Sequence, residues 1–186
     1  MHEGPGYSVV SDLETGRPMI VDETTALDIL EDLAVQQASS MDAVTVFDAA
    51  AAAAAALLGQ QLFTIMVFHA DVMEVERVYS SRPHEYPVGG RKQKHDTEWG
   101  RRVLESGEPY IGRSIDDIRR HFHDHMVIEG LGLSAILNMP VRIAGKTIGT
   151  MNLLDATPHY CEADLATAGL IAAIIAPRLQ IAAMTA

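Results

Sequence analysis

The sequence predicts an α+β domain in which a central antiparallel sheet is flanked by helices. Residues 61–81 and 133–155 each carry two runs rich in β-branched or aromatic residues around a short turn, which is the pattern of a β-hairpin. Three other segments, at 24–40, 41–59 and from about 162 onward, have apolar residues at helical spacing. Since 186 residues with 48% hydrophobic content can bury one substantial core, we expect a single domain over residues 23–186, preceded by an arm of residues 1–22.

The arm is rich in glycine, proline and polar residues without a sustained period, so it is expected to carry little of the fold. "TTALDILEDLAVQQASS" predicts an amphipathic helix that begins after a threonine cap. "MDAVTVFDAAAAAAAALLG" predicts a second helix, because alanine has the highest helix propensity, with Gly59 as its C-terminal stop. Small side chains would let this helix lie close to a sheet or to another helix.

The first hairpin is expected to turn near Ala70 and Asp71, and a long irregular segment, "SRPHEYPVGGRKQKHD", follows it. Such loops in compact domains often bind ligands, so we expect the functional site to lie near this segment. "TEWGRRVLESGEP" predicts a helix ended by Gly107, "PYIG" a short strand, and "SIDDIRRHFHDHMVIEGLG" one helix capped by Ser114.

The second hairpin turns around Gly145, and an apolar helix closes the chain. Its apolar residues surround more than one face, which favours burial against the sheet and against a second copy of the chain. We therefore expect a homodimer through the first and last helices. Pro177 is expected to kink this helix or to mark a loosened end.

Charge and cysteine content limit the partners and the compartment. A net charge of −11 argues against nucleic acid and against anionic membranes as partners, and no segment is read as a membrane span or a signal peptide. A single cysteine fits a reducing compartment, so a cytoplasmic location is expected. The segment 77–102, however, contains seven basic and three acidic residues, which gives it a local charge of +4. This basic segment could concentrate a small anion, or it could be an ordinary solvent-exposed surface.

Several stretches together resemble the GAF domain family: "RVYSSRPHEYPVGGRK", Trp99, "FHDHMVIEGLGLSAILNMPV", "GKTIGTMNLLD" and "HY" at 159–160. The resemblance covers roughly residues 25–183, and its strongest part is Asn-x-Pro-Val followed by Gly-x-x-x-Gly-Thr-x-Asn-Leu. It implies a central antiparallel sheet with the terminal helices on one face, and with helices and loops over a ligand pocket on the other. The helix-rich segment between the hairpins would cover that pocket.

The resemblance implies a sensor of a small molecule, and the residues narrow the ligand. The Asn-Lys-x-x-x-Phe-x-x-x-Asp-Glu motif of cyclic-nucleotide members is missing, and Cys161 follows the last strand instead of lying where bilins are attached. One cysteine cannot form the resolving disulfide of free methionine-R-sulfoxide reductase, which shares the fold, so that activity is not carried over. No cofactor is expected.

The candidate ligand-binding residues combine aromatic walls with polar groups. Arg91 can hold a carboxylate or phosphate, and Asp124 can receive an amine. Aromatic residues more often belong to a core, and an arginine after two glycines is more often at the surface. The candidates are Tyr79, Tyr86, Arg91, Trp99, Phe122, Asp124 and Asn138.

The run "HFHDH" raises the question of a metal site. On one helix, His121 and His125 would share a face with Asp124 beside them, but a zinc site needs three or four converging ligands. We therefore interpret the run as the rim of the pocket and keep a metal at His121 and His125 as the lesser alternative.

Three functions stay open at this point. The first is a dimeric sensor of an anionic or zwitterionic metabolite, which passes its signal to a separate output protein. The second is a small enzyme that uses His125 and Asp124 as an acid–base pair; it lacks an evident nucleophile or cofactor motif, so the chain is expected not to be an enzyme. The third is an interaction module with a collapsed pocket.

Overall fold

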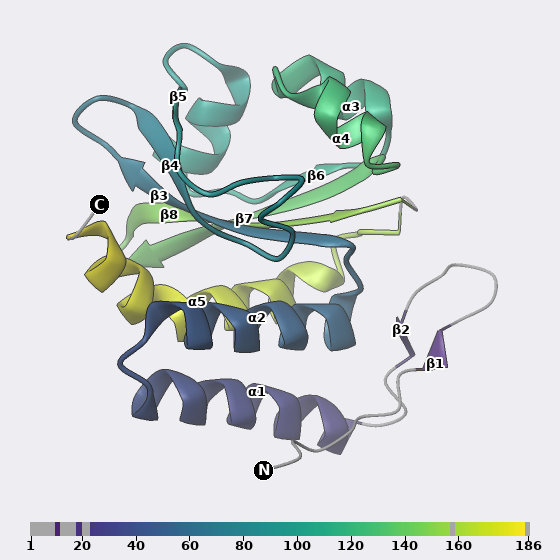
Figure 1. The fold of residues 1–186 in the computed structure, drawn as a ribbon, viewed down its shortest axis with the longest axis vertical. Coiled ribbons are helices and arrows are strands. Elements are labelled where there is room, and N and C mark those ends of the chain that lie inside the picture. The colour runs from purple at the N-terminus through teal and green to yellow at the C-terminus, as the bar shows by residue number, and fades with distance from the viewer. Residues whose placement is uncertain (1–9, 12–17, 20–22, 157–158, 185–186) are drawn as a thin grey trace.

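A six-stranded antiparallel sheet forms the centre of the molecule, with helices on both of its faces (Figure 1). The computed structural model describes residues 10–11, 18–19, 23–156 and 159–184. In chain order the strands of the sheet are β3 Leu62–His69, β4 Glu74–Ser80, β5 Arg91–Gln93, β6 Tyr110–Gly112, β7 Ala135–Ile143 and β8 Lys146–Asp155. They lie in the order β5-β4-β3-β8-β7-β6, so the two predicted hairpins join through β3 and β8.

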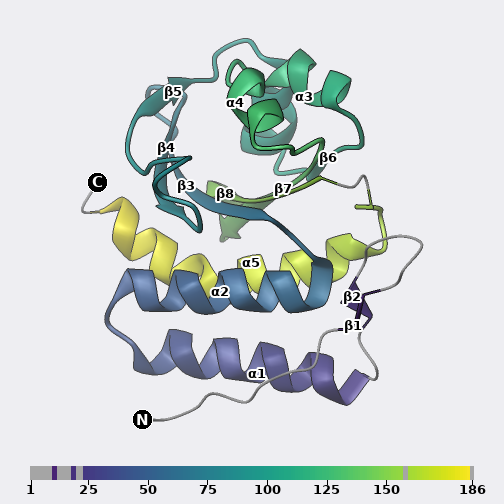
Figure 2. The same ribbon diagram turned by 45° about the vertical axis from the view of Figure 1, so that its right-hand side comes forward.

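The helices divide between the two faces of the sheet (Figure 2). One face carries α2 (Ala43–Leu58) and α5 (Asp164–Ala183), with α1 (Glu23–Ser39) packed outside them. The opposite face carries the π-helix η1 (Gly100–Glu105) and two short helices, α3 (Ile115–His121) and α4 (His125–Gly130). The α+β class and the predicted distribution of helices are therefore confirmed.

Helix α2 follows from its sequence at both ends and along its length. The Asp42 side chain caps it by accepting a hydrogen bond from the Thr45 N–H at 2.9 Å, and Gly59 ends it with a φ of 75°. Ala50 and Ala54 are fully buried, because their small side chains let α2 lie close to its neighbours. The alanine run is thus an ordered, buried face of the helix.

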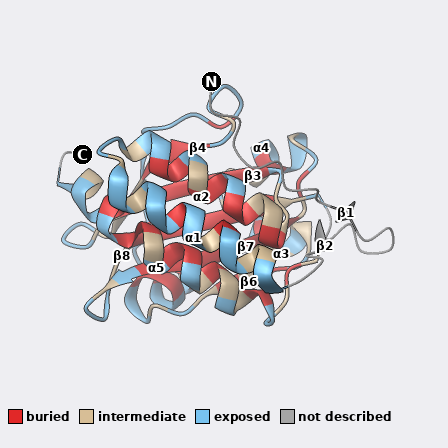
Figure 3. Cartoon of the chain, turned by 90° about the horizontal axis from the view of Figure 1, so that it is seen from below, coloured by how far each residue is buried: buried red, intermediate tan, exposed pale blue. Residues whose placement is uncertain are grey.

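Helix α5 covers the sheet with its inward residues, among them Ile171, Ile175 and Leu179, all fully buried. Figure 3 shows the helical layer from below, with α1 outermost. The helix continues through Pro177 to Ala183. By length and composition α5 is apolar enough to cross a membrane, which corrects the sequence-based reading that no segment has these properties. A core helix that packs against a sheet has the same composition.

Two apolar clusters lie on opposite faces of the sheet. The larger joins α1, α2 and α5 to the sheet, and includes Phe47 and Tyr79, whose rings meet edge to face with centroids 5.8 Å apart. The smaller lies beneath η1, α3 and α4 and includes Trp99 and Ile118. The face of the sheet to which a side chain points therefore decides which cluster it joins.

Several predicted elements differ from the structure. The helix predicted over residues 114–132 is two helices, because Phe122 has extended backbone angles (φ −124°, ψ 118°) and ends α3. Helix α1 begins at Glu23, so Thr24 and Thr25 lie inside its first turn and the predicted threonine cap is wrong. The long loop contains β5, an edge strand paired with β4.

The predicted arm, residues 1–22, lies mostly outside the described residues. Within it, β1 (Val10–Ser11) and β2 (Pro18–Met19) pair antiparallel in a separate two-stranded sheet.

Candidate functional site

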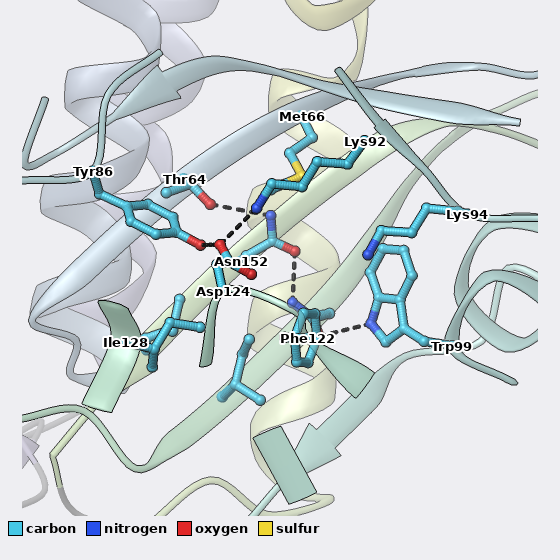
Figure 4. A pocket seen from close by; sticks show the side chains of 13 residues that line it. Thr64, Met66, Tyr86, Lys92, Lys94, Trp99, Phe122, Asp124, Ile128 and Asn152 are labelled. Atoms are coloured by element: carbon cyan, nitrogen blue, oxygen red, sulfur yellow. Dashed lines mark hydrogen bonds and ion pairs between the residues drawn. The ribbon is translucent and has the colours of Figure 1, made fainter. Parts of the chain in front are cut away.

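A cavity lies between the sheet and the segments that cover its face on the side of η1, α3 and α4 (Figure 4). Alternate residues of three central strands form its floor, because side chains two apart point to the same face of a strand. The pairing of Asn152 with Thr64 on one side and Asn138 on the other brings these residues into one row. The floor is Thr64, Met66, Ile136, Asn138, Asn152 and Leu154, and the walls are Tyr86, Lys92, Lys94, Trp99, Phe122, Asp124 and Ile128.

The space that can hold water in this cavity amounts to about 20 Å³, which is room for one or two water molecules. A wider recess lies outside it, lined by Lys92, Gln93, Lys94, His123 and Asp124. Lys92, Lys94 and Asp124 line both spaces, so these three charged side chains stand between the inner cavity and the recess. A ligand larger than a few atoms must displace side chains to enter.

A chain of side-chain hydrogen bonds crosses the cavity floor. The Trp99 indole N–H donates to Asn138 Oδ1 at 3.0 Å, and Asn138 Nδ2 donates to Asn152 Oδ1 at 2.6 Å. Asn152 Nδ2 in turn donates to Thr64 Oγ1 at 3.2 Å. Both amides are buried, and these bonds satisfy polar groups that would otherwise be costly beneath the sheet. They also fix the plane of the Trp99 ring.

Asp124 is the anionic centre of the wall. It accepts hydrogen bonds from the Tyr86 hydroxyl and from Lys92 Nζ, the latter at 2.6 Å, and Arg77 Nη2 lies 3.9 Å away. Burial alone would raise the pKa of Asp124, but the hydrogen bonds from Lys92 and Tyr86 and the charge of Lys92 outweigh it and lower that pKa. Asp124 is therefore an ionised carboxylate held by several donors.

Tyr86 is fixed between charges of opposite sign. Its ring lies over the Arg77 guanidinium, with 3.7 Å between Arg77 Cζ and the ring centroid, and its hydroxyl points at Asp124. Burial first, and then the Asp124 charge, raise the pKa of the Tyr86 hydroxyl. Tyr86 therefore stays a neutral donor that orients the carboxylate.

Lys94 is the unusual cation of the site. It is only 7% exposed, and its Nζ lies 4.8 Å from the centroid of the Trp99 ring and 5.6 Å from that of Phe122. Among the described residues no oxygen or nitrogen acceptor bonds to this ammonium. Burial and the nearby charge of Lys92 lower the pKa of Lys94 to about 8, although Asp124 opposes the shift.

The backbone around Lys94 explains how the side chain reaches this place. Its N–H donates to the Met73 carbonyl at 2.9 Å, and its carbonyl accepts from the Thr97 hydroxyl at 3.1 Å. A Cβ at Gly100 would lie 2.5 Å from the Lys94 carbonyl oxygen, so only glycine lets η1 start this close. The π-helix thereby places Trp99 beneath the Lys94 side chain.

Five of the seven residues proposed from the sequence line the cavity: Tyr86, Trp99, Phe122, Asp124 and Asn138. The structure does not bring the other two there. The Tyr79 hydroxyl donates to Asp48 Oδ1 at 2.5 Å on the opposite face of the sheet, which α2 and α5 cover. The Arg91 Nε lies 3.0 Å from Glu76 Oε2 at the sheet edge, with the arginine side chain 45% exposed.

Sequence reasoning missed Thr64, Asn152, Lys92 and Lys94. The two lysines belong to the basic segment that was noted, and their spacing of two residues on β5 and its extension was the available signal for a common face. Asn152 lies in the motif that carried the family resemblance, directly opposite Asn138 in the hairpin.

The structure separates the histidines of "HFHDH". His121 ends α3, where its ring meets Tyr110 edge to face with centroids 5.0 Å apart, and His125 begins α4. The expected common helical face is therefore absent. No group of three or more histidine, cysteine or acidic side chains in the described part of the chain is arranged to hold a metal.

The comparison with family models completes this picture. The model of the GAF domain matches residues 42–179, and the chain belongs to the GAF domain family, whose members bind small molecules and take part in signalling. No curated protein matches the chain in sequence.

Solved structures show the same fold at low identity. The GAF domain of a phosphoenolpyruvate-protein phosphotransferase from Coxiella burnetii is similar with a TM-score of 0.70 and 16% identity, over 87% of this chain and 96% of that one. The corresponding domain from Acinetobacter gives a TM-score of 0.69 at 16% identity, with the same coverage. Free methionine-R-sulfoxide reductase from Neisseria meningitidis gives 0.62 at 14% identity, over 90% of this chain and 96% of that one.

Proposed function

We propose that this GAF domain is a sensor that binds a small anionic or zwitterionic metabolite in the cavity beneath β5 and α4. The main supporting observation is Lys94, a mostly buried residue whose ammonium has no hydrogen-bond acceptor among the described residues. A mostly buried ammonium without a hydrogen-bond acceptor is costly, and Asp124 compensates it only in part, so an anion that reaches Lys94 gains a strong partner. Asp124 offers the opposite charge within the same cavity for a ligand that also carries an amine.

The net charge of the residues that line the cavity favours an anionic ligand over a cationic one. Lys92 and Lys94 face one carboxylate, Asp124, and Arg77 stands behind Tyr86. Asp124 already accepts from Lys92 and Tyr86, so the excess positive charge resides at Lys94. Trp99 and Phe122 supply the apolar surface that small-molecule sites use beside a few polar groups.

Tryptophan fluorescence and calorimetry test the proposal directly. Trp99 is the only tryptophan of the chain and lines the cavity, so its emission reports on occupancy. We expect saturable binding of at least one member of a panel of amino acids, oxo-acids and nucleotides, weakened at least about tenfold by Lys94→Met. Lys146→Met, at the exposed first residue of β8, is the matched control and should bind as the wild type does.

The assembly forms the second part of the proposal: a homodimer through α1 and α5. Leu170, Pro177 and Ile181 are exposed on α5, and Met184 directly after the helix continues their stripe, because the spacings keep all four on one face. Leu170 is 53% and Ile181 52% exposed, whereas an apolar stripe of this length is normally covered. The signal would pass from the dimer to a separate output protein, and the single cysteine supports a cytoplasmic location.

One alternative keeps a specific observation in its favour. The cavity holds only about 20 Å³ of water space, which suits an interaction module with a collapsed pocket. Absence of binding across the panel, with the dimer intact, would favour that module. The acid–base enzyme has less support, because His125 does not line the cavity and Asp124 is already engaged by Lys92 and Tyr86.

A further inference from the structure

Lys94 differs in its surroundings from the other two lysines of the chain. Lys92 donates to Asp124 at 2.6 Å, and Lys146 is exposed at the start of β8. Lys94 is buried above two aromatic rings, and among the described residues nothing accepts a hydrogen bond from it. A lysine amine that is desolvated and lies next to another cation is the kind that acts as a nucleophile.

We propose that Lys94 captures small carbonyl compounds that bear a carboxylate, by forming a reversible imine at its Nζ. The inference rests on the proposed ligand cavity and names the ligand class and the bond formed there. Lys92, the second cation of the wall, lines the same cavity as Lys94 and is available to the carboxylate of a compound whose carbonyl carbon is bound at Lys94. Because the residues that line the cavity carry more positive than negative charge, they favour a ligand with a carboxylate. The amine of Lys94 favours a ligand that also has an aldehyde or ketone group.

The condensation balances without an oxidant or a reductant. The Lys94 ammonium gives one proton to water, and the nitrogen lone pair then attacks the carbonyl carbon to form a carbinolamine. The carbinolamine oxygen takes up protons and leaves as water, and the C–N bond becomes a protonated imine. One ammonium and one carbonyl are therefore converted into one iminium ion and one water molecule, with no net change in charge.

Three features of the cavity favour this step. Burial and the charge of Lys92 lower the pKa of Lys94 to about 8, so the neutral amine is populated near neutral pH. The planar imine would lie against Trp99 and Phe122. Since Lys94 lines the outer recess as well as the inner cavity, the released water has a way out.

Reductive trapping with glyoxylate tests the inference, because glyoxylate is the smallest carbonyl acid and suits the narrow cavity. The purified full chain is incubated with glyoxylate and cyanoborohydride near pH 7.5, and peptide mass spectrometry locates carboxymethylated lysine. The three lysines compete within one molecule, so Lys92 and Lys146 serve as internal references. We expect at least about tenfold more modification at Lys94 than at Lys146, because the lower pKa leaves more neutral amine.

Two comparisons separate this inference from simple anion binding. Lys94→Arg keeps the positive charge but cannot form an imine, so it should lose the trapped product while a folded protein is verified by its thermal transition. Glycolate has a hydroxyl in place of the aldehyde, so its effect on Trp99 emission reports binding alone.

Saturable binding of glycolate with no preferential product at Lys94 would overturn the imine and leave the proposed anion site standing. Equal modification of all three lysines would also overturn it. Binding of neither acid, together with no product, would remove both the imine and the anion site.

Discussion

At the scale of single residues, Lys94 determines how the site responds to pH. Its pKa of about 8 in the folded chain lies below the ordinary value of 10.5, so the unfolded chain binds more protons between these two values. Burial of the charged form therefore costs stability below pH 8, and this cost disappears as the pH rises toward 10.5. A lysine that is retained at such a cost needs a functional reason, and a ligand anion or a free amine supplies one.

We expect Lys94→Met to stabilise the unliganded chain by about 1 to 3 kcal/mol at pH 7, the upper figure being the shift in pKa at about 1.36 kcal/mol per unit. The difference should shrink to nearly zero by about pH 10.5. Urea unfolding at both pH values measures it, with Lys146→Met as the control that changes little. A loss of stability at pH 7 would show that the contacts with Trp99 and Phe122 outweigh the cost of burial.

The amide chain on the cavity floor gives a second prediction at this scale. Asn138→Ala leaves the Trp99 indole N–H and the Asn152 carbonyl without their partners, in a fully buried place. We expect a loss of about 2 to 4 kcal/mol in the free energy of unfolding, together with a shift in Trp99 emission. Gln93→Ala, on the exposed edge strand, is the control. An unchanged emission maximum would mean that the amide does not position the indole.

At the scale of elements, the close approach of η1 to the end of the β5 segment positions Lys94 over Trp99. A Cβ at Gly100 would lie 2.5 Å from the Lys94 carbonyl oxygen and 2.7 Å from Thr97 Oγ1. We expect Gly100→Ala to lower the free energy of unfolding by about 1 to 3 kcal/mol and to weaken ligand binding. The measurement is urea unfolding combined with the Trp99 titration.

Gly130→Ala is the matched control for that change. Gly130 ends α4, and nothing lies within 4 Å of a Cβ placed there. The substitution should be neutral or stabilising by up to about 1 kcal/mol, since alanine favours helix more than glycine does. If both variants lost stability equally, the close contact at Gly100 would not be the cause.

The elements were largely predictable from the sequence, but the faces of their side chains were not. Hydrophobic period and turn residues located both hairpins and the three long helices. Tyr79 was placed in the pocket, yet the β3–β4 pairing shifts at Ile65 and Met66, so Arg77 pairs opposite Met66 and Tyr79 opposite Ile65. Such a bulge turns two residues that are two apart to opposite faces, and no local sequence signal announced it.

The break in the segment 114–132 was hidden for a related reason. Its apolar and capping pattern is helical throughout, and the extended backbone at Phe122 arises where the ring packs against Trp99, with centroids 5.8 Å apart. Tertiary packing thus overrode local propensity. The same break brings Asp124 to Tyr86 and Lys92. The prediction of one continuous helix did not include this contact.

At the scale of the whole molecule, the sheet separates two tasks. Its pocket face carries the charged cavity, and its other face carries α2 and α5, which bury the larger apolar cluster. Arg178 joins the helical layer together by donating from α5 to the carbonyl oxygens of Ser40 and Met41, in the connection between α1 and α2. The cavity floor lies on β3, β7 and β8, and α5 packs against the same three strands from the other side. A change at the floor can therefore reach α5 through these strands.

The outward face of α5 gives the last prediction, which concerns assembly. Ile181 and Leu170 are eleven positions apart, close to three helical turns, and both are about half exposed on the same side of α5. If this stripe is the dimer interface, Leu170→Glu places a charge within it and should convert a dimer into a monomer in light scattering at micromolar concentration. Val72→Glu, at an exposed apolar residue in the β3–β4 turn, adds the same charge elsewhere and should leave the mass unchanged. A wild-type chain that is already monomeric would remove α5 as the dimer interface, and the signal from the cavity would then have to leave through a surface other than this helix.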